Sequence, residues 1–110
     1  MIKGIGVDLV DLTRLNITHQ HFLERVLTKR ELELFYSKKT DQAKREFLDG
    51  RFACKEAYVK ALKKGLGEVG LLNIEILQKE NGEPYINDPN CHVSISHEKN
   101  FAIAFVVIEE

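Results

Sequence analysis

The chain lacks the apolar segments that membrane and secreted proteins carry. Its longest uninterrupted apolar run is residues 101–108, whereas a membrane-spanning helix needs roughly 18 apolar residues. The only apolar stretch near the N-terminus is interrupted by Lys3, Asp8 and Asp11, so we expect no signal peptide. These absences predict a cytoplasmic protein with no membrane contact.

Cysteine is scarce as well. Cys54 and Cys91 form no C-x-x-C pattern, which gives no support to a zinc or redox site. The adjacent Cys91 and His92 lack a second pair of ligands, so we interpret both as strand residues. The two thiols are expected to be free, as in a reducing cytosol.

What is present fits a single domain spanning residues 1–110. With 44% hydrophobic and 30% charged residues, the chain is too apolar to be disordered. Independent domains usually have about 100–150 residues. One core is therefore expected, and it needs no disulfide or structural metal.

Charge is divided unevenly along the chain. Residues 1–67 contain 14 Lys and Arg against 9 Asp and Glu, a net charge of +5, and residues 68–110 contain 2 against 8, a net charge of −6. A basic first part predicts an anionic partner, whether a phosphate group, a nucleic acid or an acidic protein. No DNA- or RNA-binding motif is present, so we expect no nucleic acid. The alternative interpretation is a solvated helix surface.

The hydrophobic pattern predicts an α+β fold, in which an antiparallel sheet packs against a long central helix and shorter helices. The first strand is expected at residues 1–12, where Gly4, Gly6 and Asp8 share one face. A first helix is expected at residues 22–27. A second short helix is expected to start at the capping box formed by Thr28 and Glu31, and a long helix at about residues 41–64. Further strands are expected at residues 72–78, 85–87, 93–97 and 101–108.

The long helix is apolar on two sides. A ridge of Ala53, Ala57 and Ala61 lies opposite a stripe of larger apolar residues, so the helix should be packed between two layers. Small side chains permit a close approach, and the glycine face of the first strand is the expected partner.

Three glycines are expected to end this helix. Gly65, Gly67 and Gly70 match G-x-G-x-x-G, but a dinucleotide site needs a strand before the motif and a helix after it. Here a helix ends and a strand begins, so a helix cap and turn are the expected structure. The loop could still bind a phosphate through its backbone N–H groups.

Two carboxylates are candidates for a metal site. A buried Asp8 would need a partner or a metal, although an exposed position at the strand end is equally consistent with the sequence. Glu56 lies four residues before Lys60, where an ordinary ion pair is the default interpretation. If the alanine ridge and the glycine face touch, Asp8 and Glu56 can meet and form a Mg²⁺ site completed by waters and substrate phosphate.

Cations flank these carboxylates. Arg51, Lys55 and Lys60 lie around the same helix and could clamp a phosphate. The alternative is that long basic side chains snorkel along a solvated edge. His97 ends an alternating strand, where a structural role is the alternative to a ligand contact.

Five segments resemble those of holo-[acyl-carrier-protein] synthases, the small bacterial type of 4′-phosphopantetheinyl transferase, in their order and at their spacing. They are Gly4-Ile-Gly-Val-Asp8, Phe22-Leu-Glu-Arg25-Val-Leu-Thr28, Gly50-Arg-Phe-Ala-Cys-Lys55-Glu56-Ala-Tyr-Val-Lys60-Ala61, Asn81-Gly-Glu-Pro84 and Ser94-Ile-Ser-His97. The resemblance spans essentially the whole chain, and the combination of motifs is highly specific.

The resemblance implies an enzyme of fatty acid biosynthesis. It would transfer the 4′-phosphopantetheine arm of coenzyme A to a serine hydroxyl of apo acyl carrier protein, leaving adenosine 3′,5′-bisphosphate. The residues matching Asp8 and Glu56 would hold Mg²⁺, and one of them would remove the serine proton directly or through a metal-bound water. Coenzyme A would be bound by Arg51, Lys55, Lys60, Gly65 and His97, and Lys60 would share the catalytic work of the carboxylates.

The resemblance also implies partners. Arg14 and Arg25 would face an acidic helix of the carrier protein, and the enzyme would be a homotrimer with active sites between subunits, which would cover apolar strand surface. Two positions depart from many relatives: Lys63-Lys64-Gly65 stands in place of Gly-Thr-Gly, and His21 in place of a basic residue. The alternative functions are a non-enzymatic trimeric binding module and a Mg²⁺-dependent phosphohydrolase.

Overall fold

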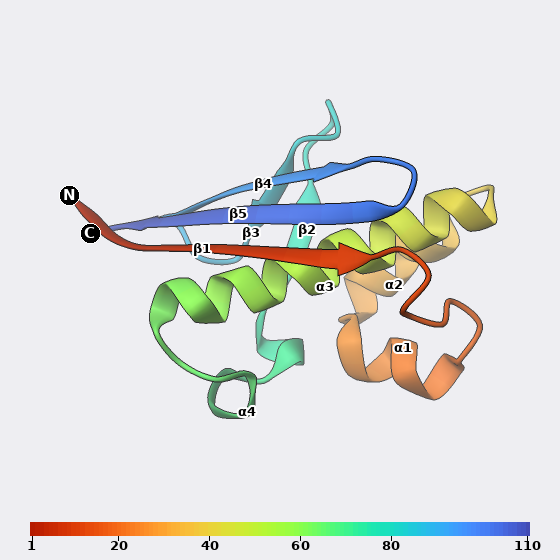
Figure 1. Ribbon diagram of the computed structural model, residues 1–110, viewed down its shortest axis with the longest axis horizontal. Coiled ribbons are helices and arrows are strands. Elements are labelled where there is room, and N and C mark those ends of the chain that lie inside the picture. Colours follow the sequence, from red (N-terminus) through yellow and green to blue (C-terminus); the bar gives the residue numbers. More distant parts are fainter.

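A long helix, α3 (Asp41–Leu62), lies along one face of a three-stranded antiparallel sheet in the computed structural model, which describes residues 1–110 (Figure 1). The other elements, in chain order, are β1 (Ile2–Asp11), α1 (Gln20–Val26), α2 (Lys29–Tyr36), α4 (Leu66–Val69), the 3-10 helix η1 (Leu71–Asn73), β2 (Ile76–Gln78), β3 (Pro84–Ile86), β4 (Cys91–His97) and β5 (Phe101–Glu109). The sheet has the order β1-β5-β4, and β2 pairs with β3 in a separate antiparallel ribbon. The predicted α+β class is confirmed. None of the helices is long and apolar enough to cross a bilayer.

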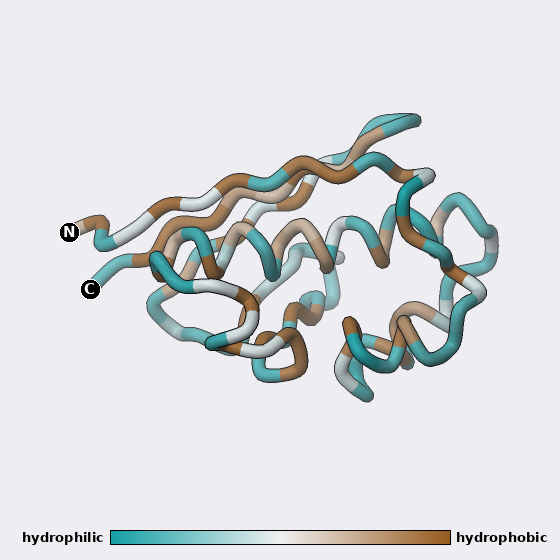
Figure 2. The backbone as a smooth tube through the Cα atoms, turned by 60° about the horizontal axis from the view of Figure 1, so that its bottom comes forward, coloured by the Kyte–Doolittle hydropathy of each residue, from teal (hydrophilic) through white to brown (hydrophobic).

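Strand β1 and helix α3 approach each other backbone to backbone. A methyl group built on Gly4 would lie 2.1 Å from the carbonyl oxygen of Ala61, and one on Gly6 would lie 1.9 Å from that of Ala57. Only glycine fits at such distances, so the predicted match of glycine face and alanine ridge is confirmed. Figure 2 shows the alternation of residue types along β1 that produces this bare face. Asp8, the next residue on the same face, is thereby brought to the side of α3.

Two cores lie on opposite sides of α3, as its two apolar sides predict. One fills the space between the helix and the sheet and includes Ala53, Ala57 and Val106. The second lies between α3 and the pair α1 and α2, and includes Phe35 and Leu48. The helix therefore connects a sheet layer to a small helical layer, which Figure 1 shows below it.

Three local expectations were wrong. Helix α3 ends at Leu62 rather than at residue 64, and its cap is Lys63, which adopts the left-handed conformation with φ of 62°. The glycine loop that follows contains the short helix α4. The strand expected at residues 72–78 is reduced to β2, because Gly70, with a positive φ of 83°, leads into η1, where the Asn73 amide donates to Val69 O at 2.7 Å.

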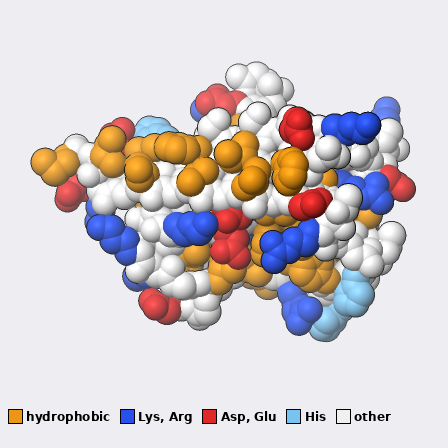
Figure 3. All heavy atoms as spheres, viewed as in Figure 1, with side chains coloured by type: hydrophobic (Ala, Val, Ile, Leu, Met, Phe, Trp, Pro, Cys, Tyr) orange, Lys and Arg blue, Asp and Glu red, His pale blue; other side chains and the backbone are white.

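The outer face of the sheet is apolar and uncovered. Alternate residues of β1 and β5 point away from α3 and are 41–59% exposed: Ile5, Val7, Leu9, Phe101, Ile103 and Phe105. Strand register pairs Val7 with Phe105 and Leu9 with Ile103, so the side chains form one continuous surface, called here the apolar sheet face. Figure 3 shows it as a band along the molecule.

Candidate active site

Asp8 and Lys60 form an ion pair where β1 crosses α3. The Lys60 ammonium lies 3.0 Å from Asp8 Oδ1 and donates a second hydrogen bond to Val7 O at 3.2 Å. The Asp8 side chain is only 19% exposed. Lys60 therefore pairs with the strand carboxylate rather than with Glu56, its neighbour one turn earlier, which was the default expectation.

Glu56 lies beside this pair with no hydrogen bond or ion pair of its own. Partial burial raises the pKa of Glu56, and the negative charge of Asp8 raises it further, while Lys60 and Arg14 oppose the shift. The charge of Asp8 acts on Glu56 because the two side chains lie near each other, from two elements that the glycines allow to touch. We call Asp8, Glu56 and Lys60 the carboxylate site. Figure 3 shows acidic side chains with basic neighbours just below the band of hydrophobic side chains.

The donors of the carboxylate site suit a hard divalent cation. Mg²⁺ typically takes one or two protein carboxylates and completes its shell with waters and substrate phosphates. No group of three or more His, Cys, Asp or Glu side chains is placed to hold a metal. A site of two carboxylates fits Mg²⁺ because waters and substrate phosphates can fill the remaining positions.

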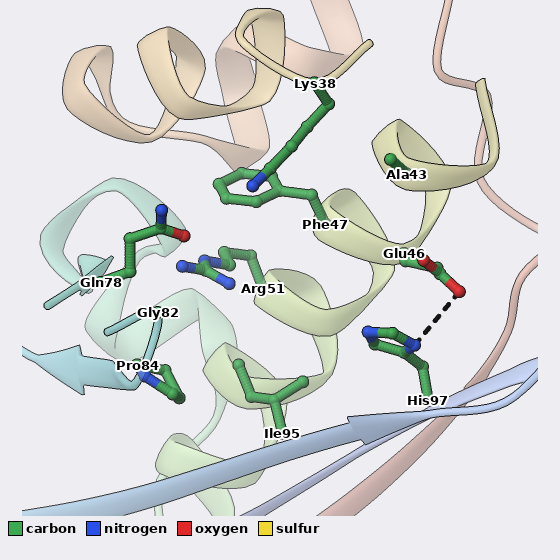
Figure 4. Close-up of a pocket in the computed structure, with 10 residues that line it drawn as sticks. All are labelled: Lys38, Ala43, Glu46, Phe47, Arg51, Gln78, Gly82, Pro84, Ile95 and His97. Atoms are coloured by element: carbon green, nitrogen blue, oxygen red, sulfur yellow. Dashed lines mark ion pairs between the residues drawn. The ribbon is translucent and has the colours of Figure 1, made fainter. Parts of the chain in front are cut away.

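A pocket of about 250 Å³ lies on the other side of α3 (Figure 4). Its walls come from four regions, namely the α2–α3 connection, α3, the β2–β3 ribbon and β4, and it is lined by Lys38, Ala43, Glu46, Phe47, Arg51, Gln78, Gly82, Pro84, Ile95 and His97. We call it the β4-side pocket. Two of its lining residues are the cations Lys38 and Arg51, so an anionic ligand is favoured.

The cations of this pocket are held by an aromatic ring and by backbone. Arg51 stacks 4.2 Å from the centre of the Phe47 ring, and Lys38 Nζ lies 5.3 Å from the same centre. Arg51 also donates from Nε to Ile76 O at 3.1 Å. These contacts fix the guanidinium at the pocket wall and leave further N–H groups for a ligand, because Arg carries five donors.

His97 is at the rim of the same pocket. Its Nδ1 lies 3.1 Å from Glu46 Oε2, and 44% of its side chain is exposed. Figure 4 shows the ring between Glu46 and the pocket interior. The carboxylate orients the ring, which leaves Nε2 free for a ligand.

The carboxylate site and the β4-side pocket lie on opposite flanks of α3. Each helical residue turns by about 100°, so Glu56 and Arg51 project about 140° apart. The sheet order separates Asp8 from His97 as well, because β5 lies between β1 and β4. A chain by itself thus presents two half-sites.

Lys55 is in neither half-site, although the sequence predicted a coenzyme A contact for it. Its side chain is 0% exposed, and the ammonium donates to Glu31 Oε1, Val26 O and Leu71 O. An ammonium has three N–H donors, and all are used. Helical geometry points this lysine into the helical layer, so in this structure it has no N–H donor left for a ligand, and the coenzyme A contact stays a prediction without structural support.

The two arginines expected at the carrier-protein surface do come together. Arg14 and Arg25 line a groove of about 280 Å³ along with Leu15, Asn16, His19 and Phe22. We call it the arginine groove. Gly65, in contrast, is exposed at the far end of α3 and lines none of these sites.

Sequence reasoning missed most of the β4-side pocket. Phe47 and Arg51 are four residues apart, a spacing that signals a stacked pair on a helix, and this signal was available. Glu46 and Lys38 carried no such signal, because tertiary packing alone brings them to His97 and Phe47.

Comparison with known proteins gives one consistent family. Residues 4–106 match the model of the 4′-phosphopantetheinyl transferase superfamily. A holo-[acyl-carrier-protein] synthase of Enterococcus faecalis is 48% identical over 116 residues, which cover 99% of this chain and 98% of the relative. The Bacillus subtilis synthase is 43% identical over 118 residues, covering 99% and 97%.

Solved structures agree with these relatives. A holo-(acyl-carrier-protein) synthase from Bacillus anthracis in complex with CoA (3′,5′-ADP) matches with a TM-score of 0.89 at 41% identity, covering 98% of this chain and 96% of that one. The synthase from Neisseria meningitidis matches with a TM-score of 0.87 at 34% identity, covering 100% of both chains.

Proposed function

Because this chain belongs to the 4′-phosphopantetheinyl transferase superfamily, we propose that it is a holo-[acyl-carrier-protein] synthase. It transfers 4′-phosphopantetheine from coenzyme A to a serine hydroxyl of apo acyl carrier protein and releases adenosine 3′,5′-bisphosphate. The observation that carries the proposal is the pair of carboxylates from β1 and α3 with Lys60 beside them, in a chain whose opposite flank holds a cationic pocket.

The reaction breaks the phosphoanhydride bond of the coenzyme A diphosphate and forms a phosphodiester bond to the serine oxygen. The serine oxygen attacks the phosphorus that carries the pantetheine arm, and the bond from that phosphorus to the bisphosphate oxygen breaks. Catalysis of this kind depends on alignment and charge neutralisation. Lys60 supplies a cation at the carboxylate site, and Arg51 and Lys38 supply cations at the β4-side pocket.

Asp8 and Glu56 would hold Mg²⁺ at the carboxylate site. When bound, this ion supplies neutralisation of the diphosphate charge and lowers the barrier to bond cleavage. Asp8 is already oriented by Lys60 at 3.0 Å. Glu56 makes no hydrogen bond or ion pair within the chain, so its oxygen that is not bound to the metal would be better placed than Asp8 to take the serine proton.

The β4-side pocket suits the adenosine bisphosphate end of coenzyme A. Lys38 and Arg51 pair with phosphate, while Phe47, Pro84 and Ile95 offer apolar contacts to the base and ribose. His97 would contact the diphosphate from the pocket rim, and Gly65 stays a predicted contact from the loop after α3.

A second copy of the chain would complete the active site. The two sites face away from each other within one chain, with β5 between β1 and β4, so coenzyme A would lie between the carboxylate site of one subunit and the β4-side pocket of the next. The apolar sheet face supplies a surface for that association. A homotrimer with three such sites is the proposed state, since cyclic symmetry repeats one interface and closes it.

The arginine groove is the proposed docking surface for the carrier protein. Arg14 and Arg25 are exposed there and match an acidic partner, and Phe22 adds apolar contact. The groove also lies near the carboxylate site, because the charge of Arg14 acts on Glu56. The proposed setting is cytoplasmic fatty acid biosynthesis.

One experiment separates this function from its rivals. Intact-protein mass spectrometry of apo acyl carrier protein, incubated with the chain, coenzyme A and Mg²⁺, should show the mass gain of one phosphopantetheine, and EDTA should abolish it. A binding module would give no gain with several apo carriers. A phosphohydrolase would degrade coenzyme A without modifying the carrier.

A further inference from the structure

Lys55 has an unusually complete set of partners for a buried cation. Its ammonium lies 2.6 Å from Glu31 Oε1, 2.7 Å from Val26 O and 3.0 Å from Leu71 O. Both side chains of the ion pair are 0% exposed. No ligand can reach Lys55, so its role must lie in the contacts that it makes with the elements carrying these three acceptors.

The acceptors mark the joint between α1 and α2. Val26 is the last residue of α1, and a helix end leaves carbonyl oxygens without partners and with partial negative charge. The Lys55 cation satisfies one of these oxygens. Glu31 is in the first turn of α2, where a negative charge is favourable, and it accepts from Thr28 N at 2.8 Å in the capping box.

The Lys55–Glu31 ion pair also connects the α1–α2 junction to other elements of the fold. Glu31 Oε2 accepts from Ile76 N at 2.8 Å, which attaches the start of β2. Leu71 O attaches η1. Lys55 itself belongs to α3, one residue before Glu56. A single buried network thus links α1, α2, η1 and β2 to the helix that carries the metal-binding carboxylate.

Helix α1 needs such an anchor. It has seven residues, too few to be stable without tertiary contacts. It carries Phe22 and Arg25 of the arginine groove on its outer side, while Leu23 and Val26 are buried beneath it. Apolar contacts hold the helix down, but a hydrogen bond to its last carbonyl also fixes its position along and around its axis.

Stability alone does not explain a buried ion pair such as Lys55 and Glu31, because removing both charges from water carries a desolvation penalty. Replacing a buried ion pair by apolar residues is often neutral or stabilising, so burial of Lys55 and Glu31 calls for another benefit. The directional contacts at 2.6–3.0 Å supply one, because they define a single arrangement of α1 on α3.

We propose that Lys55 is a positioning residue, which through Val26 O and Glu31 holds α1 and its arginine groove in register with Glu56, so that the carrier-protein serine meets the carboxylate site. This inference rests on the proposed transferase function. It assigns Lys55 to recognition of the carrier protein and removes it from recognition of coenzyme A.

The test measures the two substrates separately in the full-length protein. Lys55→Met should raise the KM for apo acyl carrier protein by at least about tenfold, since small displacements of a reacting group cost that much or more. The KM for coenzyme A should stay within about threefold of the wild-type value, because the β4-side pocket is untouched. Lys44→Met, on the same helix at a lysine without an ion pair, is the matched control and should change neither constant.

A second variant separates positioning from loss of stability. Lys55→Met leaves the Glu31 charge buried without its cation, so the double variant Lys55→Met, Glu31→Gln should be more resistant to urea than the single variant. It should nevertheless retain the raised carrier KM. Amide hydrogen exchange of residues 20–27 should be faster than in the wild type in both variants.

The outcomes divide cleanly. A double variant with wild-type carrier KM, or a Lys55→Met protein in which both KM values rise together, would overturn the inference while the transferase function stands. Absence of transfer by the wild-type chain would instead overturn the proposed function, and the inference with it.

Discussion

The two flanks of α3 differ in chemistry and in how they are built. Toward β1, the helix presents Glu56 and Lys60 beside Asp8, a site made possible by two glycines that let backbone approach backbone. Toward β4, it presents Phe47 and Arg51, whose pocket is walled by segments from four regions.

Under the proposed function, this difference means that one long helix carries two halves of an active site that meet only between neighbouring chains. The acidic flank suits a metal and a nucleophile, while the cationic flank suits the anionic end of coenzyme A. The apolar sheet face provides the association that would bring one flank to the other. Each flank can be broken independently, so the comparison makes separable predictions.

Removing the acid on the β1 flank should have the largest effect. Glu56→Gln keeps the shape of the side chain but removes a metal ligand and the proposed proton acceptor, so the rate of transfer should fall by at least about 10²-fold. Mass-spectrometric initial rates measure this. The control is Glu80→Gln, at an exposed position outside every site, and a variant at Glu56 with comparable activity would refute the role of this flank.

Charging the apolar sheet face should come next. Phe105 is 47% exposed at the centre of this face, and Phe105→Asp would bury an unpaired carboxylate in any interface formed there. Light scattering should show a monomer in place of an oligomer. Transfer should fall by about 10²-fold, because both half-sites would remain intact but apart. An oligomer of unchanged mass would rule out this face as the interface.

Weakening the β4 flank should affect coenzyme A alone. Lys38→Met removes a charge that can pair with phosphate, worth roughly 1–2 kcal/mol, so the KM for coenzyme A should rise by about tenfold. The kcat and the carrier-protein KM should change little. The adjacent Lys39 is exposed and outside the pocket, so Lys39→Met is the matched control. Equal effects of the two substitutions would indicate a general charge effect.

The smallest expected effect concerns stability on the β1 flank. Both carboxylate oxygens of Asp49 are buried without a partner. Burial, followed by the charge of Asp11, raises the pKa of Asp49 to about 7, and Arg45 opposes the shift. The folded state then holds a proton that the unfolded state releases above its ordinary pKa, so stability falls as pH rises from about 4 to 7 and stays lowered above that range.

Asp49→Asn removes this dependence. The variant's free energy of unfolding should exceed that of the wild type by an amount about 2 kcal/mol larger at pH 8 than at pH 5. Urea titration at fixed protein concentration measures this difference. Asp49→Leu should show the same trend. Parallel pH profiles for wild type and variants would mean that Asp49 has a charge partner in the assembled protein.

Features that depend on local pattern could be predicted from the sequence. The alternation of residues 1–12, the capping box at Thr28 and the match of glycines to the alanine ridge all follow from spacing. Because that match places Asp8 beside α3, the meeting of Asp8 and Glu56 was within reach of sequence reasoning too.

Features that depend on tertiary packing could not be predicted in the same way. Lys55 was assigned to the ligand because its motif suggested a phosphate clamp, but the helical layer supplies three acceptors that no local pattern reveals. The cap of α3 is the left-handed Lys63 rather than the expected glycine. The β4-side pocket joins residues 38 and 97, which only the folded chain brings together.

The most direct test of the two-flank account is complementation between broken subunits. Two variants would be co-expressed with different tags and purified as mixed oligomers: Glu56→Gln, which breaks the β1 flank, and Lys38→Glu with His97→Ala, which breaks the β4 flank. If each site uses opposite flanks of neighbouring subunits, about one site in three of a mixed trimer contains two intact halves, whichever variant contributes two of the chains. The expected result is therefore about a third of the wild-type rate from two nearly inactive chains. A mixture no more active than its separate components would show that each chain builds its site alone.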